Sequence, residues 1–513
     1  MTVLTAPKRA ARQDPVLPEP PAGEELYQYS DRGRLYVITL LVIGFASNLA
    51  AQVFLEVNAP FGWLLSPVTA LYVVYHLANM RVSLPGQGFD FAAHSQRVAA
   101  WAPQQWPTVD IFLPICGEPL GLLENTWQAV AELIRAYPGH ARAYVLDDGN
   151  DPGLEPVAAR YGLTYECRPN PGEHKKAGNL RWAFSRTEGE HIVIFDADFA
   201  PSARFLAETL PFMDDPAVGI IQTPQYFRSH PADIWVARAA GTVQEIFYRL
   251  IQVARDRLGS ALCVGTNAVY RRAALEPECG FTLIAHSEDS HTGLDTLHRG
   301  YATRYVPVVL AAGSCPSTLS SYVRQQYRWA CGSVSLVFTD SMWRAPMRWR
   351  MRMPFISGFL WNLHLSAAAV IGPVVPVAVL IYDPVLLKPG NFVILVPAIM
   401  AELLAYPLWH RSRYGPSAWP IQIVTGWAQA LAIWDYARGN IMSWQAAGGR
   451  ADSVRRFRLG IWWNALLAAA WLALAAWRTG QRHDAAFAVV AGFGLFYAVL
   501  VGCILITSWK EAR

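Results

Sequence analysis

The sequence has little net charge, few cysteines and no apolar run near its start, and each scarcity excludes a class of protein. A formal net charge of +4 is too small to indicate a protein that binds nucleic acid. The seven cysteines contain no CxxC pair, so we expect free thiols in a reducing cytoplasm and no disulfide framework. The first 26 residues carry prolines, Lys8, Arg9 and Arg12 without an apolar core. This excludes a cleavable signal peptide and predicts a disordered cytoplasmic tail over residues 1–30.

Long apolar runs are absent from about Trp101 to Arg350 but occur on both sides of this region. A run of roughly 17–25 apolar residues can cross a lipid bilayer as a helix. With 513 residues, 53% of them hydrophobic, the chain has room for a catalytic domain as well as such helices. We predict a multi-pass protein of the plasma (inner) membrane with about six spans. The six segments are Leu35–Phe54, Phe61–Met80, Pro354–Tyr382, Phe392–Trp409, Ile461–Trp477 and Ala485–Trp509.

A further apolar segment, Pro420–Tyr436, is interrupted by two glutamines and an aspartate. It lies in a stretch, residues 411–458, that holds seven arginines, and the positive-inside rule keeps such arginines in the cytoplasm. If the segment crossed the bilayer, the arginines after it would lie outside. We therefore predict an interfacial helix there, with both termini and the central region in the cytoplasm.

The central region alternates short β-rich runs with helical stretches such as Glu124–Tyr137. Nearly continuous apolar strands between amphipathic helices predict an α/β domain with a buried, mostly parallel mixed sheet. In such sheets ligands bind at the carboxyl ends of the strands. The predicted strands are Val109–Pro114, Ala143–Leu146, His191–Phe195 and Val218–Gln222.

The chain is accordingly expected to divide into six parts. They are a disordered tail (1–30), a transmembrane hairpin (31–82), a catalytic domain (95–350), transmembrane helices (351–410), an interfacial helix with a loop (411–460) and transmembrane helices (461–513).

Two aspartate pairs follow predicted strands of this domain. Asp196-Ala197-Asp198 can coordinate a hard divalent cation, Mg²⁺ or Mn²⁺, that also binds a diphosphate. An exposed turn would have the same sequence pattern. Asp147-Asp148-Gly149 can contact a nucleotide and the metal environment, or form an ordinary Asp-Gly turn. The nearby basic segment Glu173–Asn179 suits a pyrophosphate, and in isolation it also fits a solvated turn.

Two further clusters complete an ordered series. In Ser287-Glu288-Asp289 a carboxylate can act as a general base, while Ser287 also fits a helix N-cap. The segment Gln325–Trp329 (QQYRW) combines an indole face, which stacks on sugar rings, with amides and a guanidinium that hydrogen-bond hydroxyls or phosphate. Taken alone, it is an ordinary amphipathic helix.

These clusters resemble the motifs of the processive family 2 glycosyltransferases, which include cellulose, chitin, hyaluronan and mixed-linkage glucan synthases. The family pattern D, D(x)D, (T/S)ED and Q(Q/R)xRW is matched by Asp148, Asp196 with Asp198, residues 287–289 and residues 325–329. The match covers about residues 110–333. The segments Val109–Pro114, Lys176–Leu180 and Gln222–Gln225 look like the cellulose-synthase group in particular.

The resemblance implies a GT-A fold, a UDP-sugar donor, Mg²⁺ or Mn²⁺, and inversion at the anomeric carbon. Asp289, with Glu288 beside it, is then the catalytic base, and Asp198 with Asp196 binds the metal. The implied donor-binding residues are Glu118, Asp147, Asp148, Lys176 and Asp196. The implied acceptor-binding residues are Gln325, Gln326, Arg328 and Trp329. Within the predicted spans, Trp361, Asn362 and His364 are candidates for lining a channel.

Three segments depart from the cellulose-synthase pattern. Cys116 stands where relatives often carry an aromatic residue, and Leu262–Asn267 replaces a Phe-Cys-Gly-Ser type of motif. Met442–Arg450 resembles the Trp-x-Pro-Thr-Gly segment of other family members, with Ala-Ala for Pro-Thr. Because the sequence ends at Arg513, we also expect no C-terminal cyclic-di-GMP-binding domain.

The resemblance thus implies a processive enzyme that extends a β-glucan, cellulose-like or of mixed linkage, from UDP-glucose and passes it through its own channel. Three alternatives stay open: a synthase that uses UDP-N-acetylglucosamine, an enzyme that makes a single transfer to a lipid, and an inactive transport scaffold. The expected partners are the UDP-sugar, the growing polysaccharide, the lipid bilayer and an envelope accessory subunit. Nucleic acid is not expected.

Overall fold

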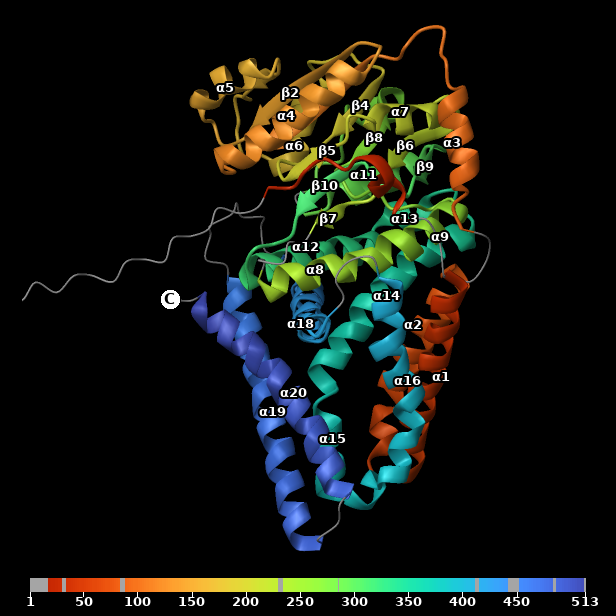
Figure 1. Cartoon of the computed structure of the whole chain (residues 1–513), viewed down its shortest axis with the longest axis vertical. Coiled ribbons are helices and arrows are strands. Elements are labelled where there is room, and N and C mark those ends of the chain that lie inside the picture. Colours follow the sequence, from red (N-terminus) through yellow and green to blue (C-terminus); the bar gives the residue numbers. More distant parts are fainter. Residues whose placement is uncertain are drawn as a thin grey trace, which may run out of the picture.

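The chain forms an α/β domain that lies on one end of a group of long helices (Figure 1). The computed structural model describes residues 17–29, 34–83, 88–228, 234–284, 286–410, 415–441, 452–482 and 486–511. Two helices, α8 (Trp235–Ile246) and α12 (Leu319–Phe338), lie along the boundary between the α/β domain and the long helices (Figure 1).

The domain is built on a seven-stranded sheet with the strand order β3-β2-β1-β4-β8-β6-β9. Only β8 runs antiparallel to its neighbours among these strands, so the α/β class with a mostly parallel mixed sheet is confirmed. A second sheet has the order β5-β10-β7. The strands are β1 (Val109–Ile115), β2 (Ala141–Asp147), β3 (Thr164–Glu166), β4 (His191–Ile194), β5 (Phe199–Pro201), β6 (Val218–Gln222), β7 (Tyr226–Arg228), β8 (Ala268–Arg271), β9 (Ala302–Tyr305) and β10 (Ala311–Ser314).

Helices cover both faces of the large sheet, which explains why β1, β4 and β6 are buried along nearly their whole length. On β1, Ile111 and Leu113 point into the cluster that includes α4, whereas Phe112 points into the opposite cluster that includes α6. The helices of the domain are α3 (Phe91–Ala100), α4 (Leu120–Ala136), α5 (Glu155–Arg160), α6 (Lys175–Phe184), α7 (Phe205–Thr209), α9 (Gln252–Arg257), α10 (Arg272–Leu275), α11 (Glu288–His298) and α13 (Asp340–Arg344).

Four helices are long and apolar enough to cross a membrane: Leu35–Asn58, Trp349–Ile371, Val454–Gln481 and Phe487–Lys510. They belong to α1 (Arg34–Asn58), α14 (Trp349–Ile371), α19 (Asp452–Arg482) and α20 (Ala486–Lys510). Four of the six predicted spans therefore coincide with such helices among the described residues.

The other two predicted spans are less regular. Helix α2 (Ser66–Ser83) carries His76, Asn79 and Arg81, which lower its hydropathy. The segment predicted as Phe392–Trp409 is divided between 3₁₀ turns, α16 (Val396–Met400), a π-helical turn and α17 (Tyr406–Trp409). The predicted span Pro354–Tyr382 also contains a break, because α14 ends at Ile371 and α15 (Val374–Tyr382) begins after Pro373. In Figure 1, α2, α15 and α16 nevertheless run alongside the four long helices.

Helix α18 (Ala418–Ala437) corresponds to the predicted interfacial helix. The axis of α18 points nearly toward the viewer below α8 and α12, whereas α19 and α20 are seen along their length (Figure 1). It therefore lies across the long helices, and it packs against α12 and α14. The segment Met442–Arg450, which resembles a gating loop, lies outside the described residues.

Part of the predicted disordered tail is folded. Residues 17–29 pack on the domain: Leu26 is fully buried, and its carbonyl accepts a hydrogen bond from the Val309 backbone N–H at 2.8 Å. The Tyr27 hydroxyl donates to Glu208 at 2.9 Å. The prediction of disorder is therefore wrong for these residues, because their apolar side chains fit a distant part of the domain, which composition alone does not reveal.

Candidate functional site

A cavity of about 1200 Å³ lies at the edge of the large sheet where β1 ends. Because β1 is parallel to β2 and β4, the residues that follow all three strands meet at this edge. All but one of the predicted site residues line the cavity. They are Glu118, Asp148, Lys176, Asp196, Asp198, Glu288, Asp289, Gln325, Gln326, Arg328 and Trp329.

The exception is Asp147, whose carboxylate is buried and already bonded. It accepts hydrogen bonds from the backbone N–H groups of Gly149 and Asp151, both at 2.7 Å, and from the Tyr165 hydroxyl at 2.8 Å. Three donors occupy the oxygens of this side chain, so its role here is to shape the turn after β2. Of the two neighbouring aspartates, Asp148 lines the cavity and Asp147 is not among its described lining residues.

Asp148 is held by a residue that the sequence analysis missed. The guanidinium of Arg168 donates to both carboxylate oxygens, at 2.6 and 2.8 Å, and to the carbonyl of Lys175 at 3.2 Å. Both side chains of the pair are buried, and such bidentate pairs fix orientation. The only signal in the sequence is a cation two residues after the short strand β3.

Lys176 lies between the two acidic clusters. Its ammonium donates to Asp196 at 2.5 Å and to the Gly265 carbonyl at 3.1 Å, and it is 3.8 Å from Glu288. Burial alone would lower the pKa of this lysine, but Asp196 and Glu288 outweigh it and raise the pKa. The lysine is therefore charged and links the carboxylates that follow β4 to those of α11.

The carboxylates near β4 have too few positively charged neighbours to balance their negative charge. Burial, together with Asp196 and Glu118, raises the pKa of Asp198 to about 7. Burial also raises the pKa of Glu118, even though its carboxylate accepts the Cys116 N–H at 2.6 Å. Within the described residues no three His, Cys, Asp or Glu side chains form a metal-binding group. The oxygen set of Asp196 and Asp198 suits a hard cation that takes its other ligands from a diphosphate.

The first turn of α11 supplies Glu288 and Asp289. Asp289 accepts the Ser290 N–H at 2.7 Å, and burial raises the pKa of both carboxyl groups. A carboxylate with a raised pKa is a better proton acceptor. Ser287 occupies the N-cap position, but its side chain makes no capping hydrogen bond. The predicted N-cap position is therefore confirmed, while the buried Ser287 hydroxyl finds no hydrogen-bond partner among the described residues.

The loop before β8 approaches Asp289 closely, and only glycine fits at Gly265. Its φ of +78° is in the left-handed region, and an added Cβ would lie 2.7 Å from the Asp289 Cβ. The buried Gln222, whose individual role the sequence analysis missed, fixes this loop. Its amide accepts the Val264 N–H at 2.9 Å and donates to the Thr266 carbonyl at 2.8 Å.

If Asp289 is the base that the family resemblance implies, Gly265→Ala should displace it and lower the rate of the catalysed reaction by at least tenfold, because small misplacements of a catalytic group are costly. Gly300→Ala is the matched control: Gly300 also has a positive φ, +89°, but no atom lies within 4 Å of its added Cβ. Steady-state rates of both variants, with melting temperatures, check this. Equal rate losses in the two variants would show that backbone strain alone is responsible.

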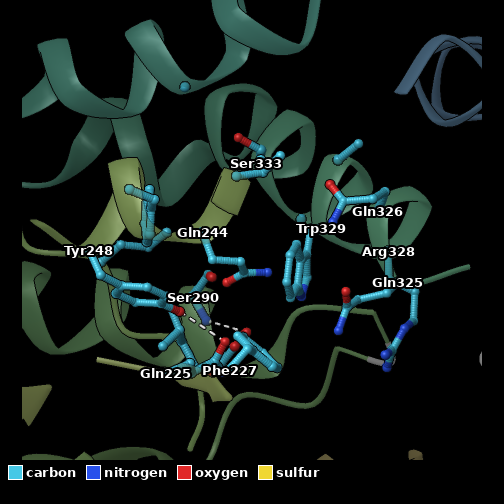
Figure 2. A pocket seen from close by; sticks show the side chains of 18 of the residues that line it. Gln225, Phe227, Gln244, Tyr248, Ser290, Gln325, Gln326, Arg328, Trp329 and Ser333 are labelled. Carbon is cyan, nitrogen blue, oxygen red and sulfur yellow. Dashed lines mark hydrogen bonds between the residues drawn. The ribbon is translucent and has the colours of Figure 1, made fainter. Parts of the chain in front are cut away.

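The indole of Trp329 lies in the middle of the cavity lining (Figure 2). Its side chain is 40% exposed. The amide of Gln244, from α8, faces it from one side, and Gln325 and Gln326 lie on the other (Figure 2). Tyr248 lies below Gln244, and its hydroxyl donates to Gln225 at 2.8 Å. Gln225 belongs to the segment Gln222–Gln225 noted in the sequence, whereas Gln244 and Tyr248 were not predicted, because no motif marks their part of the chain.

Arg328 is the cation of this platform nearest to the acidic clusters. Burial lowers its pKa, and the carboxylates of Glu288, Asp196, Asp289 and Asp198 oppose that effect. The guanidinium therefore lies in the field of both acidic clusters. A diphosphate, which carries adjacent negative charges, could bind the Arg328 guanidinium at this position.

Helix α12, which carries Gln325–Trp329, is tied to the long helices by polar contacts. The Tyr327 hydroxyl donates to Asp435 of α18 at 2.8 Å. Asp435 also accepts two hydrogen bonds from Arg456 of α19, both at 2.6 Å. At the start of α12, Glu511 accepts the Ser320 N–H at 3.0 Å. These contacts fix the position of the helix.

Asp435→Asn should destabilise the protein by about 2 kcal/mol, because charged hydrogen bonds to a buried group are lost. Tyr327→Phe, which removes one hydroxyl, should have a smaller effect. Thermal unfolding of both variants tests this. Unchanged stability in Asp435→Asn would contradict a positioning role.

The cavity extends from the α/β domain to the long helices. Its lining includes Asn79 of α2, Trp361 and Asn362 of α14, and Gln422 and Gln429 of α18. Trp361 and Asn362, which were expected to line a channel, thus line this cavity. His364 is not among the described lining residues; it stacks on Tyr75 with a ring-centroid distance of 5.1 Å.

Comparison with known proteins shows what the domain is similar to. Residues 191–408 match the profile of glycosyl transferase family group 2. Relatives at more than 30% identity include cellulose synthases.

One such relative is cellulose synthase 1 of Komagataeibacter xylinus, which is 34% identical over 50% of this chain and 17% of its own length. Another is the cellulose synthase catalytic subunit (UDP-forming) of Pseudomonas fluorescens, 33% identical over 52% of this chain and 37% of its own length. The chain thus spans well under half the length of these relatives. Among solved structures, a mannosyltransferase from Pyrobaculum calidifontis, in complex with GDP-Man and Mn²⁺, has a TM-score of 0.45 and 20% identity. That match covers 76% of this chain and 99% of the mannosyltransferase.

Proposed function

We propose that the protein is a processive, inverting membrane glycosyltransferase that extends a β-glucan from UDP-glucose and passes it through its own channel. The observation that carries this proposal is the single cavity that joins the acidic clusters, Trp329 and the polar residues of α14 and α18. An enzyme that releases its product after one transfer needs no such connection. The relatives named as UDP-forming cellulose synthases support UDP-glucose as the donor.

The donor binds at the carboxyl end of the sheet in this proposal. Asp148, oriented by Arg168, and Glu118 contact the uridine part, and Lys176 and Arg328 contact the diphosphate. Asp196 and Asp198 hold Mg²⁺ or Mn²⁺, whose chemistry is to neutralise the charge of the departing nucleotide. The raised pKa of Asp198 fits this assignment, because that cluster of oxygens is short of positive charge.

The acceptor approaches from the opposite side. Its terminal sugar stacks on Trp329, since sugar rings present apolar C–H faces to aromatic rings. The attacking hydroxyl then lies beside Asp289, which takes its proton as the bond to the anomeric carbon forms. Glu288 and Lys176 set the charge around the base. UDP leaves on the far face of the sugar, so the configuration at the anomeric carbon inverts.

The growing chain leaves through the long helices. We propose that α2 and the irregular segment 389–409 complete six spans with the four long apolar helices. This places the GT-A-type domain in the cytoplasm and the protein in the plasma (inner) membrane. Polar side chains such as Asn362 and Gln429 line the cavity near α14 and α18, where a polysaccharide needs hydrogen-bond partners.

Incubation of the purified protein with radiolabelled UDP-glucose tests this proposal. We expect an ethanol-insoluble polymer that a glucanase degrades and whose linkages are β. A product that partitions into organic solvent would indicate single transfer to a lipid. A polymer formed only from UDP-N-acetylglucosamine would reassign the donor, and the absence of UDP release with every UDP-sugar would favour an inactive scaffold.

A further inference from the structure

A second cleft, of about 560 Å³, lies apart from the catalytic cavity and is lined chiefly by arginines. We call it the arginine cleft. Its charged lining residues are Asp256, Arg257, Arg304, Arg348 and Arg350. The lining thus contains four arginines and one carboxylate. The proposed sugar transfer uses none of these residues.

The carboxylate of the cleft is already neutralised. Asp256 accepts two hydrogen bonds from Arg304, at 2.9 and 3.3 Å, and a third from the Tyr305 backbone N–H at 2.8 Å. Arg348 and Arg350 have exposed side chains, and no ion pair is found for either within the described residues. The cleft therefore has an excess of positive charge that an anion can compensate.

The cleft combines parts of the α/β domain with the start of a long apolar helix. Asp256 and Arg257 end α9 and Arg304 lies on β9, whereas Arg350 is on α14. The chain turns at Gly259, with a φ of +72°, and approaches the Met351 side chain of α14 there. Because α14 is long and apolar enough to cross a membrane, its first turn lies at the level of the lipid headgroups.

Exposed tryptophans mark the same level. Trp349, between Arg348 and Arg350, is 59% exposed, and Trp343 is 48% exposed. Tryptophan side chains at both ends of membrane helices prefer the interface between headgroups and acyl chains. The partial positive charge of the α14 N-terminus adds to the attraction of an anion.

We propose that the arginine cleft binds the phosphate of an anionic phospholipid headgroup and so fixes the α/β domain against the bilayer surface. This inference rests on the membrane location in the proposed function. A lipid is the occupant of choice because the cleft opens at the start of an apolar helix, where the acyl chains of the lipid can follow α14. Free phosphate would satisfy the guanidinium groups but not this apolar surface.

The test compares lipid binding by the full chain and by variants of the cleft. Protein in detergent micelles that contain phosphatidylcholine is titrated with phosphatidylglycerol, and bound lipid is counted by native mass spectrometry. R348Q/R350Q should bind phosphatidylglycerol roughly thirtyfold more weakly, given an attraction of about 1 kcal/mol for each basic residue near an anionic surface. R348K/R350K, which keeps the charge, should recover most of the binding. R344Q is the matched control, because Arg344 pairs with Asp340 at 2.9 Å outside the cleft and should leave binding unchanged.

Three results would overturn the inference. They are equal binding by the wild type and R348Q/R350Q, equal binding of phosphatidylcholine and phosphatidylglycerol, and displacement of the lipid by inorganic phosphate at matched concentration. Glutamine and lysine variants that are equally defective would also count against it.

Asp289→Asn separates the two proposals, since this variant should bind phosphatidylglycerol like the wild type even if sugar transfer is never found. Full polymer synthesis without any lipid preference would remove the lipid site and leave the proposed function intact.

Discussion

Asp289→Asn should lower the rate of sugar transfer by about a thousandfold, which is within the usual contribution of a general base. The substitution keeps the size of the side chain and one oxygen for the Ser290 N–H, but the amide does not take up the proton of the acceptor hydroxyl. The rate of UDP release at saturating donor measures the loss. The affinity for UDP should change little, because the base faces the acceptor and not the nucleotide.

Asp295→Asn is the matched control for this prediction. Asp295 lies on the same helix α11, where it accepts a hydrogen bond from the Thr282 hydroxyl at 2.7 Å, and it is not among the described residues that line the cavity. Its variant should transfer sugar at nearly the wild-type rate. If Asp289→Asn retained more than a tenth of the activity, another group would have to be the base.

Asp198→Asn should lower transfer by roughly a thousandfold and abolish its response to divalent cations, because a metal contributes several kcal/mol of charge stabilisation. In the wild type, a chelator should stop the reaction and added Mn²⁺ or Mg²⁺ should restore it. In the variant, one of the two carboxylates of the pair is missing, so added metal should restore little. Titration of the rate against metal concentration measures both effects.

The control for the metal prediction is Asp214→Asn. Asp214 accepts a hydrogen bond from the Trp101 indole at 3.2 Å, and its carboxylate lies away from the cavity lining. This variant should respond to metal like the wild type. Full activity of the wild-type protein in excess chelator would contradict a metal site at Asp196 and Asp198.

Much of the site could be predicted from the sequence because its motifs are local. An apolar strand followed directly by a carboxylate, as at Asp196, places the carboxylate at a known edge of a parallel sheet. Lys176 and Asp289 were implied by the family resemblance, and each lies in the first turn of a helix. The order of the motifs along the chain, together with the apolar segments around them, indicated a family to whose profile residues 191–408 are similar.

Other parts of the site depend on contacts between distant segments. The sequence does not distinguish Asp147 from Asp148, but Tyr165 and two backbone N–H groups bind the first and Arg168 binds the second. No motif in the sequence includes Gln244, because its helix α8 is positioned by packing against neighbouring helices. The segment Phe392–Trp409 was predicted as one span, since apolar composition does not show where the helix is interrupted.

The sequence by itself determined the chemical groups of this protein, the class of its sheet and the apolar character of its long helices. These properties follow from residue type and short-range periodicity, which each segment carries with it. Only the tertiary structure decided which carboxylates face the cavity, how α12 is tied to α18 and α19, and where the arginines of α9, β9 and α14 meet. Those features need hydrogen bonds and packing between residues far apart in the chain, and such contacts exist only after folding.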